Sequence, residues 1–171
     1  MDLKAKLRHV MDFPKEGIDF IDITTVLQDQ AALNQSIEEM KKFAQEFGEF
    51  DLIIGPESRG FIFGTPLAYA LNKGFVPIRK KGKLPYKTVS VEYQLEYGKD
   101  VLEIHEDAIQ PGQRVVIVDD LLATGGTIEA NIRLVEKLGG EVAGLIFFIE
   151  LGFLNGRQKL QGHKVRSVVN F

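Results

Sequence analysis

Apolar and polar residues along the chain alternate between a helical period and runs that are typical of strands. Between residues 37 and 47, apolar residues recur every three to four positions, which predicts a helix that ends at Gly48. The short apolar run at 52–54 predicts a buried strand. Further predicted elements are a helix that ends near Gly74, strands at 75–78, 115–118 and 142–149, and a helix at 128–138. This alternation predicts repeated βαβ units, and therefore an α/β fold with a mostly parallel, twisted sheet flanked by helices.

Two segments depart from this alternation. Residues 79–99 begin with basic residues and continue with Tyr and Glu, and their length suits a functional flap better than a connector. Residues 152–171 predict one short helix and a final strand, and their sequence indicates no function. The whole chain is expected to form a single domain, 1–171, because its 171 residues suffice for one hydrophobic core.

The most informative segment runs from Val115 to Thr127. Its β-branched start predicts a buried strand, and the acids Asp119 and Asp120 are expected past that strand, on the solvent side of the core. A turn with two glycines then opens onto a predicted helix, whose free N–H groups and positive dipole end suit an anion. The proposed anion seat consists of Ala123, Thr124, Gly125, Gly126 and Thr127.

The residue types in this seat fit a sugar phosphate. Gly125 and Gly126 allow positive φ and close backbone approach, while the hydroxyls of Thr124 and Thr127 can bind phosphate oxygens or cap the helix. The two acids would repel a phosphate at contact, so we expect them to bind sugar hydroxyls, or a metal that the sugar phosphate carries. A plainer alternative is a solvated turn followed by an ordinary glycine loop. The ordered succession of strand, acids, glycine turn and helix favours a ligand site.

Two common nucleotide-binding motifs are excluded at this position. No Lys follows the glycines, so the segment is not a P-loop, and the GxGxxG spacing of dinucleotide-binding folds is absent. A second loop, GPESRG at 55–60, is expected at the same sheet edge. Arg59 offers a planar fork to phosphate oxygens, and the amides of residues 58–60 can also bind them. The alternative for this loop is a helix-capping Ser58 and a solvated Arg59.

These motifs closely resemble those of the type I phosphoribosyltransferases, which bind 5-phosphoribosyl 1-pyrophosphate (PRPP). The resemblance rests on VVIVDDLLATGGT, on FPKEGIDF, DITTVL and GPESRGFIFG, and on RKKGKLP and LEYGKD, which are similar to the adenine-type branch. It implies the type I fold, with a small N-terminal hood at about 1–25 and a long flexible catalytic loop at about 79–99. It also implies Mg²⁺-dependent transfer of ribose 5-phosphate from PRPP to adenine, which gives AMP and releases pyrophosphate.

The resemblance assigns roles to residues outside the anion seat. It implies that Glu57, Ser58, Arg59 and Gly60 contact pyrophosphate. Five basic residues lie between 79 and 87, and cations over a departing pyrophosphate would stabilise the transition state. The resemblance favours Arg79 and Lys83 for this role, in the same or the neighbouring subunit of a homodimer. A solvated or nucleic-acid-attracting loop is the alternative.

Glu96 is the residue that we expect to carry the acid–base chemistry. The purine nitrogen attacks while its ring proton departs, and a carboxylate can accept or orient that proton. In the family, the matching Glu approaches the base when the flap closes. Tyr97 would pack over the phosphates or the ribose. The alternative is a Glu and a Tyr exposed together on a β loop.

The base is expected to bind between the hood and the strand that carries the acids. Phe20 can stack on a purine, and backbone groups of a hood strand can read its edge. The resemblance assigns these contacts to Ile18, Asp19, Phe20 and Ile21, with Leu121 on the opposite face. Asp19 and Ile21 depart from the usual family residues, which leaves another purine base as an alternative substrate.

Composition and charge narrow the remaining function classes. The net charge of -3 argues against a nucleic-acid partner, and no apolar run suits a signal peptide or a membrane span, so the cytoplasm is expected. The chain has no Cys, and its three His residues lack metal-ligand spacing, so no protein metal site is expected. Mg²⁺ would be held mainly by PRPP and water. A PRPP- or nucleotide-sensing regulator and a structural oligomer with a vestigial site remain alternatives to the enzyme.

Overall fold

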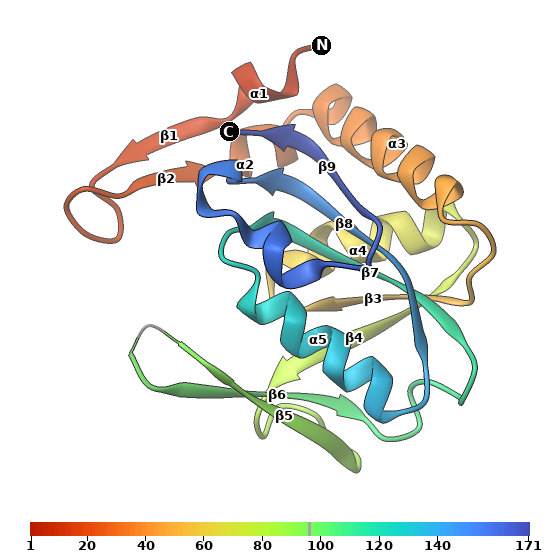
Figure 1. Ribbon diagram of the computed structural model, residues 1–171. Helices are drawn as coiled ribbons and strands as arrows, with labels where there is room; N and C mark the ends of the chain where they lie inside the picture. The colour runs from red at the N-terminus through yellow and green to blue at the C-terminus, as the bar shows by residue number, and fades with distance from the viewer. Residues whose placement is uncertain (96) are drawn as a thin grey trace.

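The computed structural model describes residues 1–95 and 97–171, and its main sheet has seven strands in the order β5-β6-β4-β3-β7-β8-β9 (Figure 1). Pairing is parallel from β4 through β3, β7 and β8 to β9, whereas β5 and β6 add to β4 in antiparallel fashion. The strands are β3 (Leu52–Pro56), β4 (Gly74–Lys80), β5 (Thr88–Gln94), β6 (Lys99–His105), β7 (Arg114–Leu122), β8 (Glu141–Glu150) and β9 (Val165–Asn170). The mostly parallel α/β sheet predicted from the sequence is confirmed.

Helices cover both faces of the sheet. α3 (Gln30–Glu46) and α4 (Arg59–Ala70) pack on one face, and α5 (Gly126–Lys137) packs on the other (Figure 1). Successive residues of a strand point to opposite faces, so Val116 and Val118 of β7 join the cluster under α3 and α4, whereas Val115 and Ile117 join the cluster under α5. Burial on both faces explains why the start of β7 is an uninterrupted apolar run.

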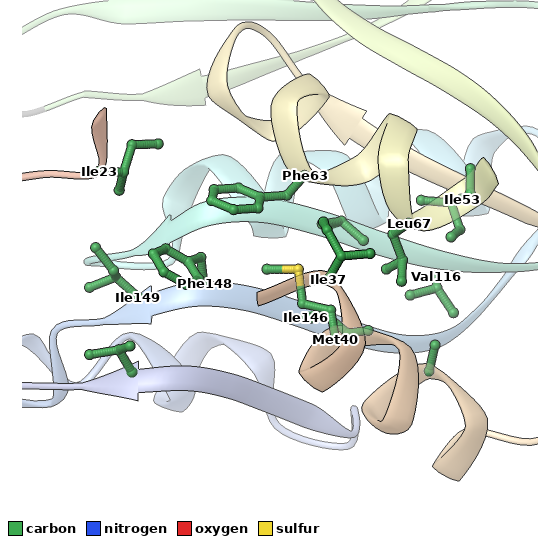
Figure 2. Packing of buried hydrophobic residues seen from close by; sticks show 14 of the residues in the cluster. Ile23, Ile37, Met40, Ile53, Phe63, Leu67, Val116, Ile146, Phe148 and Ile149 are labelled. Carbon is green, nitrogen blue, oxygen red and sulfur yellow. The ribbon is translucent and has the colours of Figure 1, made fainter. Parts of the chain in front are cut away.

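One contact in this core fixes the first turn of α4. Figure 2 shows Phe63 of α4 lying over Phe148 of β8, and the two rings stack with their centroids 4.7 Å apart. Both side chains are fully buried. Phe63 lies one helical turn after Arg59, on the same side of α4. The packing of Phe63 therefore holds the Arg59 end of the helix against the sheet.

The N-terminal residues form the hood that the resemblance implied. After α1 (Leu3–Lys6), strands β1 (Arg8–Met11) and β2 (Asp19–Asp22) pair as an antiparallel hairpin, in a sheet separate from the main one (Figure 1). The short helix α2 (Thr24–Leu27) then leads to α3. Through Ile23 and Val26 the end of the hood enters the core under α3 and α4, which ties the hairpin to the main body.

The structure departs from the sequence prediction at several element boundaries. β7 continues through Asp119 and Asp120 to Leu122, so the acids lie within the strand and not after it. Most of the segment 79–99, predicted as a loop, belongs to the β5–β6 hairpin, whose alternating Val89, Val91 and Tyr93 pack under α5. The charged residues of this segment masked its strand period. The tail contains two 3₁₀ helices, η1 (Gly152–Leu154) and η2 (Gly156–Leu160), where one short helix was predicted. Among the helices that the structure describes, none has the length and apolar character needed to cross a bilayer.

Candidate active site

The predicted anion seat lies where β7 ends and α5 begins. Gly125 is the N-cap of α5 and adopts a left-handed φ of 89°, as the glycine at this turn predicted. Gly126 is already the first helical residue. The cap makes no side-chain hydrogen bond, and the first bond of the helix runs from the Glu129 N–H to the Gly125 carbonyl at 2.9 Å. The N–H groups of the first turn therefore point toward an anion site, and neither Thr124 nor Thr127 caps the helix.

The acid pair was wrongly predicted to lie on the solvent side of the core. Asp120 is buried and Asp119 is half-buried, because β7 carries both into the edge of the sheet. The Asp119 Oδ1 atom accepts the Asp120 backbone N–H at 2.8 Å, and the Arg59 Nε atom lies 2.8 Å from Asp120 Oδ2. Arg59 is therefore paired with an acid, while its side chain stays 41% exposed.

The two carboxyl groups differ in their affinity for a proton. Burial raises the pKa of Asp119 well above its usual value, and the neighbouring charge of Asp120 raises it further. Burial also raises the pKa of Asp120, but the Arg59 guanidinium opposes that rise. The pKa is therefore raised at both carboxyl groups, and more strongly at Asp119. Two adjacent carboxyl groups suit the two neighbouring hydroxyls of a ribose.

A cavity of about 190 Å³ joins the acid pair to the anion seat. Its wall is formed by the last part of β7, the turn and the first residues of α5, with Arg59 facing them from α4. The structure thus brings together most of the residues predicted to hold a sugar phosphate. They are Asp119, Asp120, Ala123, Thr124, Gly125, Gly126 and Thr127, and they are joined by Arg59, predicted to bind pyrophosphate, and Leu121, predicted to face the base.

A second, mostly apolar pocket of about 140 Å³ lies beneath the hood. It contains all the residues predicted to contact the base, which are Ile18, Asp19, Phe20, Ile21 and Leu121. Arg59, Asp120 and Leu121 line this pocket as well as the first one. The Arg59 guanidinium carbon lies 5.5 Å from the centre of the Phe20 ring. The two pockets therefore meet at the Arg59–Asp120 ion pair.

Asp19, one of the two departures from the family pattern, has a partner in the hood. Its Oδ2 atom lies 2.7 Å from His9 Nδ1 across the β1–β2 hairpin. The carboxyl group is therefore bound to an imidazole of the same hairpin. This contact leaves the backbone groups of β2, together with the Phe20 ring, as the hood groups suited to read a base edge.

Ile149 and Leu151 also line the base pocket, and the sequence prediction missed both. Ile149 lies in register with Leu121, because β8 runs parallel to β7. Parallel strands end at the same edge of a sheet, so the carboxyl end of the predicted strand at 142–149 was a usable signal. The prediction used only the motif on β7.

The loop after β3 brings together a different group of side chains. Glu57 and Ser58 are joined by a cis peptide bond, and Ser58 is the N-cap of α4 without making a side-chain capping bond. The Glu57 Oε1 atom lies 3.2 Å from Arg79 Nε, and its Oε2 atom lies 2.6 Å from Lys83 Nζ. The predicted cations therefore contact Glu57, and they do not line the phosphate cavity among the residues that the structure describes. Gly60 packs against Asp119, since a Cβ atom there would lie 3.1 Å from its Oδ1 atom.

Of the two flap residues near 96 with predicted roles, the structure describes Tyr97, which lies between β5 and β6. Glu96 falls outside the described residues, so its predicted catalytic role stays a prediction. Tyr97 is exposed and lines neither pocket as these are defined by the described residues.

The tail supports the anion seat, although its sequence indicated no function. A Cβ atom on Gly125 would lie 2.7 Å from the carbonyl oxygen of Gly156, and one on Gly156 would lie 2.4 Å from the Ala123 carbonyl. Next to Gly156, the guanidinium of Arg157 donates two hydrogen bonds to the buried carboxylate of Glu150, from Nε to Oε1 at 2.6 Å and from Nη2 to Oε2 at 2.8 Å. η2 therefore forms the floor of the turn 123–125.

Comparison with known proteins identifies close relatives of this chain. The family model described as a phosphoribosyl transferase domain matches residues 22–168. Adenine phosphoribosyltransferase from Acetivibrio thermocellus is 72% identical over 171 residues, which is 100% of both chains, and the enzyme from Ruminiclostridium cellulolyticum is equally similar over the same lengths. The crystal structure of adenine phosphoribosyltransferase from Thermoanaerobacter pseudethanolicus matches with a TM-score of 0.96 at 60% identity, covering 99% of this chain and 98% of that one.

A structure with bound ligands is also similar. Adenine phosphoribosyltransferase from Saccharomyces cerevisiae, complexed with D-2,5-dideoxy-2,5-imino-altritol 1,6-bisphosphate and adenine, matches with a TM-score of 0.93 at 41% identity. The match covers 98% of this chain and 96% of that one.

Gly125→Ala tests whether the floor of the turn shapes the anion seat. Ala would be strained at a φ of 89°, and its Cβ atom would press on the Gly156 carbonyl, so the turn must move. With about 1–3 kcal/mol of strain, we expect the Kd for PRPP, the ligand that the sequence resemblance implies, to rise roughly tenfold. Isothermal titration calorimetry measures this affinity.

Gly162→Ala provides the matched control for this substitution. Gly162 has a φ of 88°, but no atom lies within 4 Å of its Cβ position. The control therefore carries the same backbone strain without the contact beneath the turn. Equal PRPP affinities in the two variants would show that the contact with Gly156 does not shape the seat.

Proposed function

The chain belongs to the phosphoribosyltransferase family, in its adenine phosphoribosyltransferase branch, and we propose that it transfers the 5-phosphoribosyl group of PRPP to adenine as a cytoplasmic homodimer. The products are AMP and pyrophosphate. One observation carries this proposal beyond family membership: a cavity for a sugar phosphate and an apolar pocket for a flat base share Arg59, Asp120 and Leu121. This arrangement supports a reaction at the junction of the two pockets, where the ribose and the base would meet.

Each part of PRPP has a suitable neighbour in this arrangement. The 5-phosphate binds the N–H groups of the turn 123–127, since the start of α5 is open to an anion. The ribose hydroxyls bind the adjacent carboxyl groups of Asp119 and Asp120. The diphosphate extends toward the loop 57–60. Adenine enters the pocket between Phe20 and Leu121, where the apolar walls favour a flat ring.

The carboxylates at the edge of β7 are also compatible with the Mg²⁺ that PRPP would bring. Among the residues that the structure describes, no group of three or more His, Asp or Glu side chains is arranged to hold a metal. Mg²⁺ prefers oxygen ligands, retains several waters and commonly binds through one or two carboxylates and substrate phosphates. When bound, the ion would neutralise charge on the departing diphosphate. Asp119 and Asp120 are the side chains in the cavity that would face its water shell.

Two alternatives from the sequence remain distinguishable by experiment. The Asp19 side chain binds His9, so we expect the backbone of β2 to recognise the base. Recognition by backbone groups alone is compatible with another purine. A PRPP- or nucleotide-sensing regulator would bind the same ligands without turnover.

The exposed side of α4 supports the homodimer. Ile62, Pro66 and Tyr69 lie at positions i, i+4 and i+7, so they share one face of the helix, and Tyr69 is 89% exposed. An exposed aromatic residue on an apolar helical face is typical of a protein interface. α4 begins at the loop 57–60, which we expect to bind the diphosphate. A partner that binds this face of α4 would therefore lie close to that loop. It would bring Arg79 and Lys83 of one chain near the site of the other.

The direct test of the function is a panel of purine bases, incubated one by one with PRPP and Mg²⁺. We expect adenine to give AMP and pyrophosphate, with hypoxanthine and guanine far slower, because a pocket that reads ring-edge donors and acceptors rejects a base that leaves them unpaired. Chromatography coupled to mass spectrometry identifies the product. If a different purine gives the nucleotide, that base replaces adenine as the substrate. If no base gives a nucleotide, the proposed enzymatic activity is refuted.

Glu96→Gln tests the predicted acid–base residue. If Glu96 handles the purine proton as the bond forms, kcat falls by roughly 10²- to 10⁴-fold, while KM for PRPP stays within a few-fold. Steady-state kinetics measure both constants. If Glu96 only holds the flap closed, kcat and KM change together, and a wild-type kcat would remove Glu96 from catalysis.

Tyr69→Glu tests the proposed dimer face. A charge placed in an apolar interface is desolvated without a partner, so we expect the dimer to dissociate at micromolar concentration. Sedimentation velocity measures the mass in solution. Gln45→Glu adds the same single negative charge on the exposed side of α3 and serves as the control. An unchanged dimer in the Tyr69 variant would move the interface to another face.

A further inference from the structure

The side chain of Glu57 is oriented away from the phosphate cavity and toward the turn after β4. β3 and β4 pair in parallel, with Pro56 opposite Ile78, and the Glu57 N–H donates to the Ile78 carbonyl at 2.9 Å. This pairing places Glu57 beside the residues that follow β4. Its Oε1 atom accepts the Lys80 backbone N–H at 2.8 Å, in addition to its contact with Arg79. The carboxylate is thus fixed to the backbone of the basic segment.

Glu57 uses only one donor of each cation. Arg79 contacts it through Nε, and among the described residues the two terminal nitrogens of Arg79 make no hydrogen bond. Lys83 contacts it through one of the three protons on Nζ, and the structure gives no second partner for that ammonium group within the described part of the chain. Both cations are therefore oriented while most of their donors stay available for another anion.

Burial and charge support this orientation. The Glu57 side chain is 11% exposed, whereas those of Arg79 and Lys83 are 35% and 48% exposed. Burial raises the pKa of Glu57, but the bonds from Lys83 and from the Lys80 N–H outweigh it and hold the pKa below its usual value. Glu57 is therefore an ionised, enclosed anchor, and the two cations are its exposed partners.

We propose that Glu57 is a positioning residue, which holds Arg79 and Lys83 so that their remaining donors bind the diphosphate, and that its carboxylate does not itself contact substrate. The inference rests on the proposed function, because it assigns a role within the same site. The backbone of Glu57 stays part of the loop 57–60 that the resemblance assigns to pyrophosphate. Glu57 has the same role whether the diphosphate is bound in the same subunit or in the partner, since the subunits of a homodimer are identical.

A purely electrostatic role would have the opposite consequence. If Glu57 acted only through its charge, removing one negative charge near the site would strengthen the binding of an anion. If Glu57 positions the cations, its loss weakens anion binding even though the local potential becomes more positive. The sign of the change therefore separates the two roles.

Glu57→Gln is the variant that tests the proposal. Gln keeps the size of Glu and can accept the Lys80 N–H, but it loses the charge-assisted bonds to Arg79 and Lys83. We expect the Kd for pyrophosphate, measured by calorimetry with Mg²⁺, to rise at least about tenfold and kcat to fall with it. The Kd for AMP should stay unchanged, because AMP carries no diphosphate. Unchanged or tighter pyrophosphate binding would overturn the proposal.

A double-mutant cycle with Lys83→Met tests the route of the effect. If Glu57 acts through Lys83, Glu57→Gln changes pyrophosphate affinity much less when Lys83 is already replaced. Equal effects of Glu57→Gln in both backgrounds would exclude action through Lys83. Glu92→Gln provides a matched control, since it removes the same charge from the exposed hairpin, where Glu92 pairs with Lys99. We expect no change in that control.

Two further comparisons keep the outcome interpretable. Glu57→Asp retains the charge, but its shorter side chain cannot reach Arg79, Lys83 and the Lys80 N–H together. It should therefore also weaken pyrophosphate binding. It replaces Glu57→Gln if that variant does not fold. Wild-type AMP synthesis is measured in parallel. A wild-type protein that makes no AMP refutes the proposed function, whereas an active wild type with unchanged pyrophosphate affinity in both Glu57 variants refutes only the positioning role.

Discussion

The parallel pairing of β7 with β3 and β8 is the constraint on which the site depends. Because these strands run in the same direction, their carboxyl ends meet at one edge of the sheet. The loop 57–60 follows β3. The acid pair lies near the end of β7, and the anion seat follows that strand. Ile149, which lines the base pocket, lies near the end of β8. No single one of these strands carries a complete site. The parallel register brings the three incomplete parts together.

This arrangement requires two adjacent carboxyl groups at a partly enclosed sheet edge, which is energetically costly. Burial disfavours the charged form of both acids, and the charge of Asp120 raises the pKa of Asp119 further. Arg59 offsets this cost at Asp120, and Phe63 one turn later anchors the helix that carries Arg59. A buried ion pair is only weak evidence for stability, since its desolvation cost commonly equals its attraction. The Arg59–Asp120 pair therefore makes most sense as part of the ligand site, where the two pockets meet.

The sequence predicted the features of this fold that are local along the chain. The apolar run of β7, the glycine that needs a positive φ and the alternation of strands and helices each depend on a few neighbouring residues. These features were enough to place the anion seat, and the family resemblance supplied the residues of the base pocket. The sequence could not reveal which side chains meet across the fold. Glu57 contacts Lys83 from 26 residues away, and nothing in either segment alone distinguishes a substrate-binding acid from an anchor for cations.

The role of the tail shows the same limit. Arg157 and Ser167 both bind the buried carboxylate of Glu150, with Ser167 Oγ donating to Glu150 Oε2 at 2.6 Å. It joins the end of β8 to β9 and to η2, and through Gly156 it supports the turn that receives the phosphate. Gly125 and Gly156 lie on the two sides of this contact. Because neither has a Cβ atom, the backbones of the turn and of η2 can approach each other closely. The 5-phosphate seat is therefore built from two segments about 30 residues apart, of which only the first carries a recognisable motif. The motif indicates where the ligand binds, and the segment without a motif supports the conformation of the turn.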